Sequence, residues 1–305
     1  MRTEILLEPG SLAEAVDEAT RCALAAGVLV PIETEQERIA DAGVCFLLRV
    51  VASLRRKASG RPGGAGGQRR PADPFLPPEP ELTVAEVSSR HLAVLNKFNV
   101  LERHLLIVTR AFEPQETLLS PGDLRALFAC MAEYPSLGFY NGGTVAGASQ
   151  AHKHLQLVPL PFEPDGPAFP MQPLMDAGTR GSVGRCPDLP FAHAFARLDQ
   201  PVAAAPMEAA EQAGALYLEL LTAVGIEGRG ADGAVRQSAP YNLLVADDWM
   251  LVVPRAGEFF RGVSVNALGF AGSLFVKDRR QLEVIRAAGP MHILRTVAGS
   301  PREPT

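Results

Sequence analysis

The segment 152–158, with the sequence HKHLQLV, is the strongest constraint on how this chain can fold. Alternate side chains of a strand point to opposite faces of a sheet. In a strand, His152, His154 and Gln156 would therefore lie on one face, and the residues between them, which include two leucines, would lie on the other. The strand would end at the prolines that follow. The segment predicts a sheet strand that carries two imidazole rings and one carboxamide on a common face.

Other stretches of the chain show the period of a strand or of a helix. Strands are predicted, in chain order, at 44–51, 82–88, 104–110, 137–143 and twice within 241–255, around an Asp-Asp turn. Helices are predicted at 10–28, 120–134 and 207–226, and one or two more within 281–298. Residues 58–74 and 162–205 lack a clear period. We expect a flexible loop in the first and a long excursion over the surface in the second.

Strands and helices alternate along the chain, and short links between several strands favour hairpins. This pattern predicts an α+β fold with a mostly antiparallel sheet and packed helices. We expect residues 104–110, 139–142 and 152–158 to lie in one sheet, with the helix 120–134 packed on it. Residues 238–277 should add strands close to the two histidines rather than form a detached domain.

The overall composition excludes several kinds of protein. With 47% hydrophobic residues, a chain of 305 residues can bury a large core, and we expect a single unit of two intertwined halves, 1–160 and 161–305. The net charge of −5 gives no indication of non-specific binding to nucleic acid. No stretch approaches the ~20 apolar residues of a membrane helix. The chain shows no signal peptide, and its four cysteines never form CxxC, so we expect a cytoplasmic protein with reduced thiols.

A glycine-rich loop precedes the histidine segment, with the sequence NGGTVAGASQ at 141–150. Glycines let backbone amides approach an anion closely, and successive N–H groups form an anion-binding nest. A neutral imidazole whose far nitrogen keeps its proton can act as a nucleophile. Its attack on phosphorus gives a phosphoramidate, which divides one transfer into two steps. Loop and histidines together indicate phosphoryl chemistry.

Other interpretations of the same residues remain open at this point. His152 and His154 could bind zinc, with His104 as a third ligand, in a non-catalytic nucleotide-binding or metal-binding protein. Ser149 lacks the G-x-S-x-G context of a hydrolase nucleophile and is better explained as a loop hydroxyl. Lys97, taken alone, is best explained as a surface lysine.

The run YNGGTVAGASQAHKHLQLVPLP resembles the histidine-triad-type motif of the ATP adenylyltransferases, also called diadenosine tetraphosphate phosphorylases. Residues 73–115 resemble the first half of this family, and residues 238–277 resemble its second half. The resemblance covers roughly two-thirds of the chain. The family is similar in fold to the galactose-1-phosphate uridylyltransferases, which share the HxHxQ pattern.

This resemblance implies a role for each matching residue. His154 would be the nucleophile, His152 would orient it through its backbone carbonyl, and Gln156 would hydrogen-bond the transferred phosphoryl group. The substrate would be bound by residues of the loop and of more distant segments: Lys57, Asn96, Lys97, Asn141, Gly147, Ala148, Ser149, Gln150, Asn242, Met250 and Arg255. The resemblance assigns no metal ligand in the protein itself.

The activity implied by the resemblance is the cleavage of diadenosine polyphosphates by phosphate, through an adenylyl-histidine intermediate, to ADP and ATP. The partners would be small nucleotides and phosphate, with Mg²⁺ carried by the polyphosphate. Glutamine at 156 favours phosphorolysis, because its side chain cannot act as a general base for water. A sugar-phosphate nucleotidyltransferase is the alternative enzyme.

Overall fold

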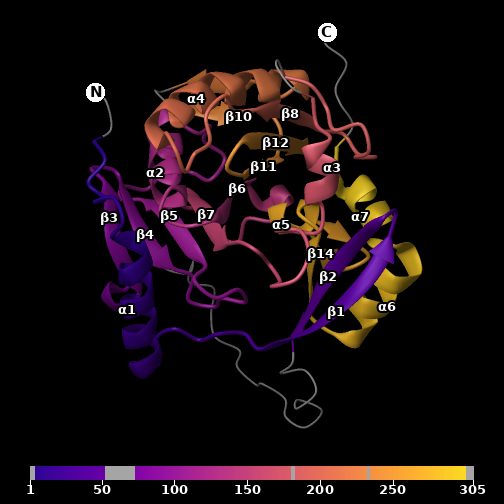
Figure 1. The fold of residues 1–305 in the computed structure, drawn as a ribbon, viewed down its shortest axis with the longest axis horizontal. Helices are drawn as coiled ribbons and strands as arrows, with labels where there is room; N and C mark the ends of the chain where they lie inside the picture. The colour runs from indigo at the N-terminus through magenta and orange to yellow at the C-terminus, as the bar shows by residue number, and fades with distance from the viewer. Residues whose placement is uncertain (1–3, 52–72, 180–182, 232–233, 300–305) are drawn as a thin grey trace.

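A large antiparallel sheet lies at the centre of the protein (Figure 1). The structure, a computed structural model, describes residues 4–51, 73–179, 183–231 and 234–299. The sheet has eight strands in the order β3-β4-β5-β7-β6-β11-β12-β8. Their bounds are β3 Thr83–Ser88, β4 His91–Leu95, β5 Leu105–Thr109, β6 Ser136–Gly142, β7 His154–Pro159, β8 Ala194–Arg197, β11 Tyr241–Val245 and β12 Trp249–Pro254.

One face of this sheet is covered by three long helices, α1 (Leu12–Ala25), α2 (Pro121–Met131) and α4 (Pro206–Ala223). Helix α2 begins at a capping box in which Ser120 and Asp123 exchange hydrogen bonds. Leu155 and Leu157 of β7 are fully buried in the core between this face and the helices. A hairpin of β9 (Gly228–Ala231) and β10 (Ala234–Gln237) lies beyond α4 in the chain.

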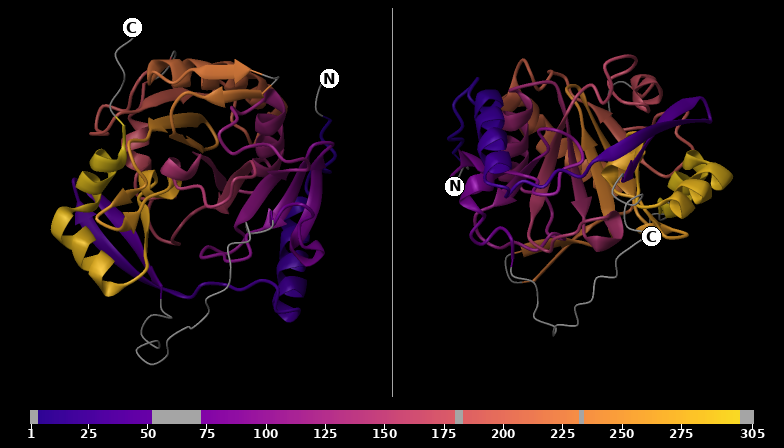
Figure 2. Two further views of the ribbon diagram at one scale, coloured as in Figure 1. Left: turned by 180° about the vertical axis from the view of Figure 1, so that it is seen from behind. Right: turned by 90° about the horizontal axis from the view of Figure 1, so that it is seen from below.

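The other face of the large sheet packs on a second layer, which contains a three-stranded sheet (Figure 2). Strands β1 (Thr34–Asp41) and β2 (Val44–Val51) form a hairpin, and β15 (Ser273–Val276) pairs with β2 in the parallel direction. Helices α6 (Arg279–Ala288) and α7 (Pro290–Val297) pack against this sheet. The N-terminal hairpin and the C-terminal helices therefore lie side by side, as Figures 1 and 2 show.

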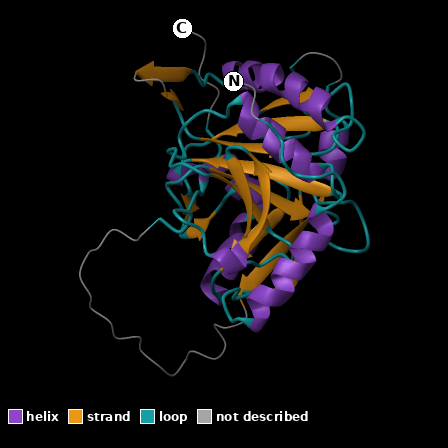
Figure 3. Ribbon diagram, turned by 90° about the vertical axis from the view of Figure 1, so that its left-hand side faces the viewer, coloured by secondary structure: helices purple, strands orange, loops and turns teal. Residues whose placement is uncertain are grey.

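Short elements fill the space between the two layers. They are the helices α3 (Gln172–Asp176) and α5 (Ala267–Phe270), the hairpin strands β13 (Phe259–Phe260) and β14 (Val263–Ser264), and the 3₁₀ turn η3 (Thr144–Ala146). A second 3₁₀ turn, η2 (Pro80–Leu82), packs instead against α1. Figure 3 shows the result, with helices on both sides of the central strands. In the described part of the chain, no helix is both long and apolar enough to cross a bilayer.

The predicted fold class and sheet are confirmed. Strands β5, β6 and β7 lie in one antiparallel sheet, and α2 packs on it. Strand β11 pairs directly with β6, so the second half of the chain does add strands beside the histidines. Strand β7 begins at His154 rather than at residue 152, because His152 forms only an isolated bridge with Pro114.

The prediction of a surface excursion over residues 162–205 was wrong. This segment contributes α3 and the edge strand β8. Its aromatic residues are buried in the core between the layers, among them Phe169, Phe191 and Phe195. The segment lacks a period because it crosses the core irregularly, yet its apolar area is sufficient to hold it there.

Candidate active site

A cavity of about 400 Å³ lies at the end of β7, between the large sheet and α5. Its walls come from both halves of the sequence. The polar groups around it are Asn96, Lys97, His104, Asn141, Ser149, Gln150, His154, Gln156 and Asn266, with Gly147 in the loop. Phe75, Leu82, Val94, Phe98, Leu106, Leu268 and Phe275 supply apolar surface. Polar and apolar side chains in the wall of one cavity suit a ligand that joins a charged group to a flat ring.

His154 occupies the first position of β7 and is 3% exposed. Its ring Nδ1 donates a hydrogen bond to the backbone carbonyl of His152 at 2.8 Å. Burial lowers the pKa of His154 to about 4. The ring is therefore neutral at physiological pH, with its proton on Nδ1, and Nε2 carries a free lone pair at the wall of the cavity.

The backbone of His154 is held by a single carboxamide. The backbone N–H of His154 donates to Oε1 of Gln115 at 2.9 Å, and Nε2 of Gln115 donates to the carbonyls of His154 and Asn141. Gln115 therefore joins β7 to β6 where their direct pairing has ended. No sequence pattern singled out this residue.

The ring of His152 lies outside the cavity, and each of its nitrogens faces an acceptor. Nδ1 is 2.8 Å from Oδ2 of Asp73, and Nε2 is 2.8 Å from the carbonyl oxygen of Thr109. Nε2 is also 2.9 Å from the hydroxyl oxygen of Thr109, so protein groups engage both ring nitrogens of His152. Only the backbone carbonyl of His152 hydrogen-bonds to the ring of His154. A role of His152 in catalysis through this hydrogen bond stays a prediction.

The glycine-rich loop forms one wall of the cavity. Gly147 has a φ of 92°, and a Cβ atom there would stand 2.8 Å from Cβ of Asn266, so only glycine fits. Asn141 is buried, and its Oδ1 accepts from Nδ2 of Asn242 and from the backbone of Ala267. Ser149 and Gln150 are exposed at the cavity, whereas Ala148 is buried and does not line it.

Three residues predicted to bind substrate lie behind the cavity rather than in it. Asn242 and Arg255 are buried and bonded to each other, and both donate to the carbonyl of Ala146 in the loop. Desolvation lowers the pKa of Arg255 to about 10. Met250 is fully buried in the core under the helices, with Leu155. Direct substrate contact by these three residues stays a prediction, and Lys57 lies outside the described residues.

Of the predicted residues on the first strands, Asn96 and Lys97 both line the cavity. Nζ of Lys97 pairs with Glu79 at 2.6 Å. Asn266 and Leu268 also line it but were not predicted. Both residues belong to the segment 238–277, which resembles the second half of the family, but nothing in its sequence pattern distinguishes them from their neighbours. His104, considered only as a zinc ligand, is hydrogen-bonded to Gln156.

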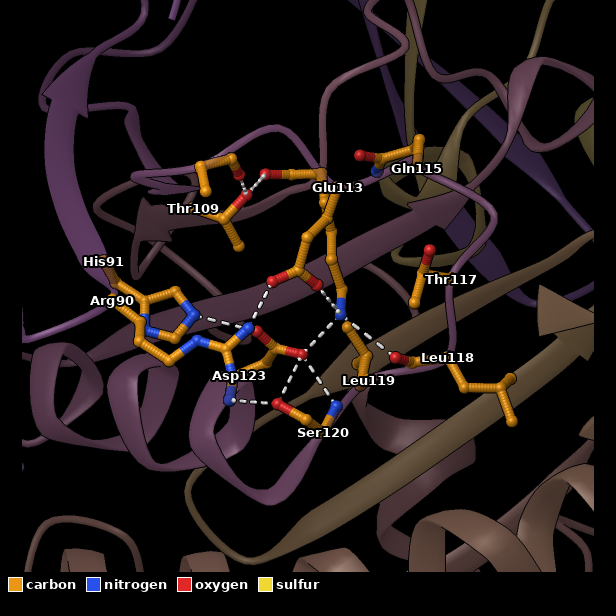
Figure 4. Close-up of polar contacts among 12 residues, drawn as sticks. Arg90, His91, Thr109, Glu113, Gln115, Thr117, Leu118, Leu119, Ser120 and Asp123 are labelled. Carbon is orange, nitrogen blue, oxygen red and sulfur yellow. Dashed lines mark hydrogen bonds and ion pairs between the residues drawn. The ribbon is translucent and has the colours of Figure 1, made fainter. Parts of the chain in front are cut away.

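Behind the histidine segment lies a buried ionic network (Figure 4). Lys153 is fully buried, and its Nζ donates to Asp123 at 2.6 Å, to the carbonyl of Leu118 at 3.0 Å and to Glu113 at 3.3 Å. The other carboxylate oxygen of Asp123 is 2.8 Å from Nε2 of His91. Burial opposes ionisation of Asp123, yet the contacts with His91 and Lys153 together lower its pKa. Behind the histidines the face opposite the cavity therefore carries a buried ion pair at Lys153 as well as the apolar side chains of Leu155 and Leu157.

The donor set around the cavity does not match a protein-held metal. Within residues 4–51, 73–179, 183–231 and 234–299, no group of three or more His, Cys, Asp or Glu side chains could hold an ion. Both ring nitrogens of His152 are engaged with Asp73 and Thr109. His104 is likewise bonded on both sides.

Two family models and one curated relative match the sequence of this chain. A sequence model described as "Ap4A phosphorylase N-terminal domain" matches residues 2–177, and "ATP adenylyltransferase C-terminal domain" matches residues 187–300. The chain is 29% identical over 241 residues to diadenosine 5',5'''-P1,P4-tetraphosphate phosphorylase 2 of Saccharomyces cerevisiae, covering 69% of this chain and 70% of the relative.

Solved structures share the fold. The crystal structure of yeast Ap4A phosphorylase Apa2 superposes with a TM-score of 0.75 at 22% identity, covering 98% of this chain and 99% of that one. The same yeast protein in complex with Ap4A gives a TM-score of 0.75 at 22% identity, covering 96% and 98%.

Proposed function

The chain belongs to the Ap4A phosphorylase family, and from this premise we propose that it cleaves diadenosine tetraphosphate (Ap4A) by phosphorolysis. Nε2 of His154 attacks the α-phosphorus, and the bond from that phosphorus to the bridging oxygen breaks, so that ATP leaves. An oxygen of inorganic phosphate then attacks the adenylyl-histidine, the P–N bond breaks, and ADP leaves. The protein is thus a nucleotidyltransferase with a covalent intermediate.

One observation supports this proposal above all others, the state of the His154 ring. Its Nδ1 proton is held by the His152 carbonyl, and burial keeps the ring neutral. The opposite nitrogen is therefore a lone-pair donor at the wall of a cavity that Gly147, Ser149 and Gln150 of the glycine-rich loop also line. A phosphorus atom bound there would be in line for attack without any prior proton transfer from the nucleophile.

The position of Gln156 beside His154 supports phosphate as the acceptor. A carboxamide cannot take a proton from water, so the intermediate would persist until phosphate arrives. ATP needs no proton to leave, because its terminal phosphate is already a stable anion. Gln156 is 8% exposed and lines the cavity, so its amide can reach an oxygen of the transferred group.

The product test follows directly from this mechanism. Purified protein is incubated with Ap4A, with and without inorganic phosphate, and the nucleotides are separated by chromatography. With phosphate we expect equal amounts of ATP and ADP, and without it no more than one ATP per protein chain. Replacing Gln156 by His should raise the share of AMP, because an imidazole can activate water. Mainly AMP and ATP from the unaltered protein at high phosphate would contradict the proposal.

The proposal extends to partners and location. Small nucleotides and phosphate would be the only substrates. Magnesium would arrive bound to the polyphosphate and neutralise its charge, since the described residues hold no cluster of metal ligands. No step of the mechanism passes through a metal held by the protein. The free cysteines of the described chain, Cys22, Cys45, Cys130 and Cys186, are compatible with the reducing cytoplasm.

The lowered pKa of His154 predicts an unusual dependence of adenylylation on pH. An ordinary histidine is protonated, and so loses its nucleophilic lone pair, as the pH falls through 6.5, whereas the ring of His154 stays neutral down to about pH 4. The rate of ATP release in a single turnover without phosphate should therefore be nearly constant from pH 8 to pH 5. Quenched-flow measurement across this range is the test, and an inflection near 6.5 would contradict it.

The same lowered pKa also makes folding sensitive to acid. The unfolded histidine takes up its proton near pH 6.5, and the folded one takes it up only near pH 4. The free energy of unfolding should therefore fall between these two values as the pH decreases, by at most about 1.4 kcal/mol per pH unit for this residue.

A further inference from the structure

Three polar side chains from neighbouring strands form a row at the edge of the cavity. Asn96 follows β4, His104 precedes β5, and Gln156 lies in β7. Nδ2 of Asn96 is 3.2 Å from Nδ1 of His104, and Nε2 of His104 is 3.0 Å from Oε1 of Gln156. The backbone N–H of Asn96 also donates to the carbonyl of His104 at 3.0 Å, which fixes the first two residues opposite each other.

The direction of every hydrogen bond in this row follows from one contact. Oδ1 of Asn96 accepts from the backbone N–H of Phe98, so the amide nitrogen of Asn96 must be the group that faces His104. That nitrogen donates, and Nδ1 of His104 therefore accepts and carries no proton. The pKa of His104 is lowered to about 4 by burial, so the ring is neutral.

A neutral ring without a proton on Nδ1 must carry it on Nε2. His104 therefore donates to Gln156, and only the oxygen of that carboxamide can accept. The amide nitrogen of Gln156 is left as a donor, and no described residue accepts from it. Gln156 and His154 line the same cavity, so a phosphoryl group on His154 offers the acceptor that this nitrogen lacks.

We propose that His104 is a positioning residue, which fixes the carboxamide of Gln156 so that its nitrogen, and not its oxygen, meets the phosphoryl group transferred to His154. This inference rests on the proposed function. A carboxamide is nearly symmetric in shape and can turn by half a rotation at little cost. Turned the wrong way, it would present an oxygen to the anionic phosphoryl oxygens and repel them.

Two substitutions separate this role from simple packing. His104→Phe keeps the ring, which contacts Phe139 with centroids 5.9 Å apart, but removes both hydrogen bonds. His104→Gln restores a nitrogen donor close to the position of Nε2. We expect kcat for Ap4A to fall roughly tenfold to a hundredfold in His104→Phe, with KM little changed, and to recover substantially in His104→Gln.

A double-mutant cycle then tests whether His104 acts through Gln156. Once Gln156→Ala has removed the carboxamide, adding His104→Phe should lower kcat no further. If the two losses multiply, His104 acts by another route and the proposal is overturned. His193→Phe serves as the matched control, because His193 is also a buried, doubly hydrogen-bonded histidine but lies outside the cavity. It should leave kcat unchanged.

A measurement without substrate distinguishes failure of this inference from failure of the proposed function. The side-chain amide group of Gln156 can be observed in a ¹H–¹⁵N NMR spectrum and assigned with Gln156→Ala. In the unaltered protein it should give one pair of sharp resonances, and in His104→Phe the pair should broaden or exchange as the group turns. An identical pair in both proteins would overturn the inference, whatever reaction the protein catalyses.

Discussion

Replacing His154 by Asn is expected to abolish adenylyl transfer, with kcat reduced on the order of a millionfold. Asparagine occupies similar space and can still donate to the His152 carbonyl, which accepts from His154 at 2.8 Å. It offers no lone pair that can attack phosphorus, and Lys153 is turned away into its ionic network. The measurement is a sensitive radiochemical assay of ATP release, because the residual rate will be small.

Two companion variants identify the nucleophile. In His154→Gly the space left by the ring should admit free imidazole, and added imidazole should restore part of the activity. In His152→Ala the carbonyl remains, so a loss of about a hundredfold is expected from poorer orientation alone. Peptide mapping of protein treated with Ap4A without phosphate should find the adenylyl group on His154. Its presence on His152 or Lys153, or full activity of His154→Ala, would defeat the mechanism.

Replacing Lys153 by Met is expected to cost about 3–5 kcal/mol in the free energy of unfolding. The substitution keeps the length of the side chain but leaves Asp123, only 1% exposed, without the cation that it pairs with at 2.6 Å. Asp123 also caps α2, so the helix start loses support at the same time. Urea unfolding followed by fluorescence gives the free energy.

Lys97→Met is the matched control for this variant. Lys97 also forms an ion pair at 2.6 Å, with Glu79, but the two side chains are 37% and 44% exposed. Exposed pairs contribute at most about 1 kcal/mol. Equal losses in the two variants would show that the buried network behind the histidines has no special role in stability.

The parts of the fold that could be predicted from sequence were those with a regular period. The segments around β5, β6, β7, β11 and β12 alternate or carry unbroken apolar runs, and the sheet they form was expected. The segment 162–205 could not be predicted in this way, because its buried aromatic residues follow an irregular path. Residues 34–41, which form β1, alternate too weakly to be recognised as a strand.

The site was predictable where it is contiguous in sequence. His154, Gln156 and the loop from Asn141 to Gln150 follow one another along the chain and meet at the cavity. Asn266 and Leu268 could not be selected, since they lie at the start of α5, a helix of four residues that is too short to show a period in the sequence. The hydrogen bond of His104 to Gln156 was hidden for a different reason, since it joins two strands at a register that only the structure gives.

The parallel pairing of β15 with β2 has a consequence for folding during synthesis on the ribosome. Strand β2 is among the first elements to emerge, and its partner, residues 273–276, is among the last. Until then β2 presents an unpaired edge, of the kind that invites association with other chains. Folding of this layer must therefore wait for almost the whole chain, and a high contact order of this sort slows it. The two sequence domains, 2–177 and 187–300, consequently share one sheet, because the first holds β1 and β2, the second holds β15, and neither can complete the sheet alone.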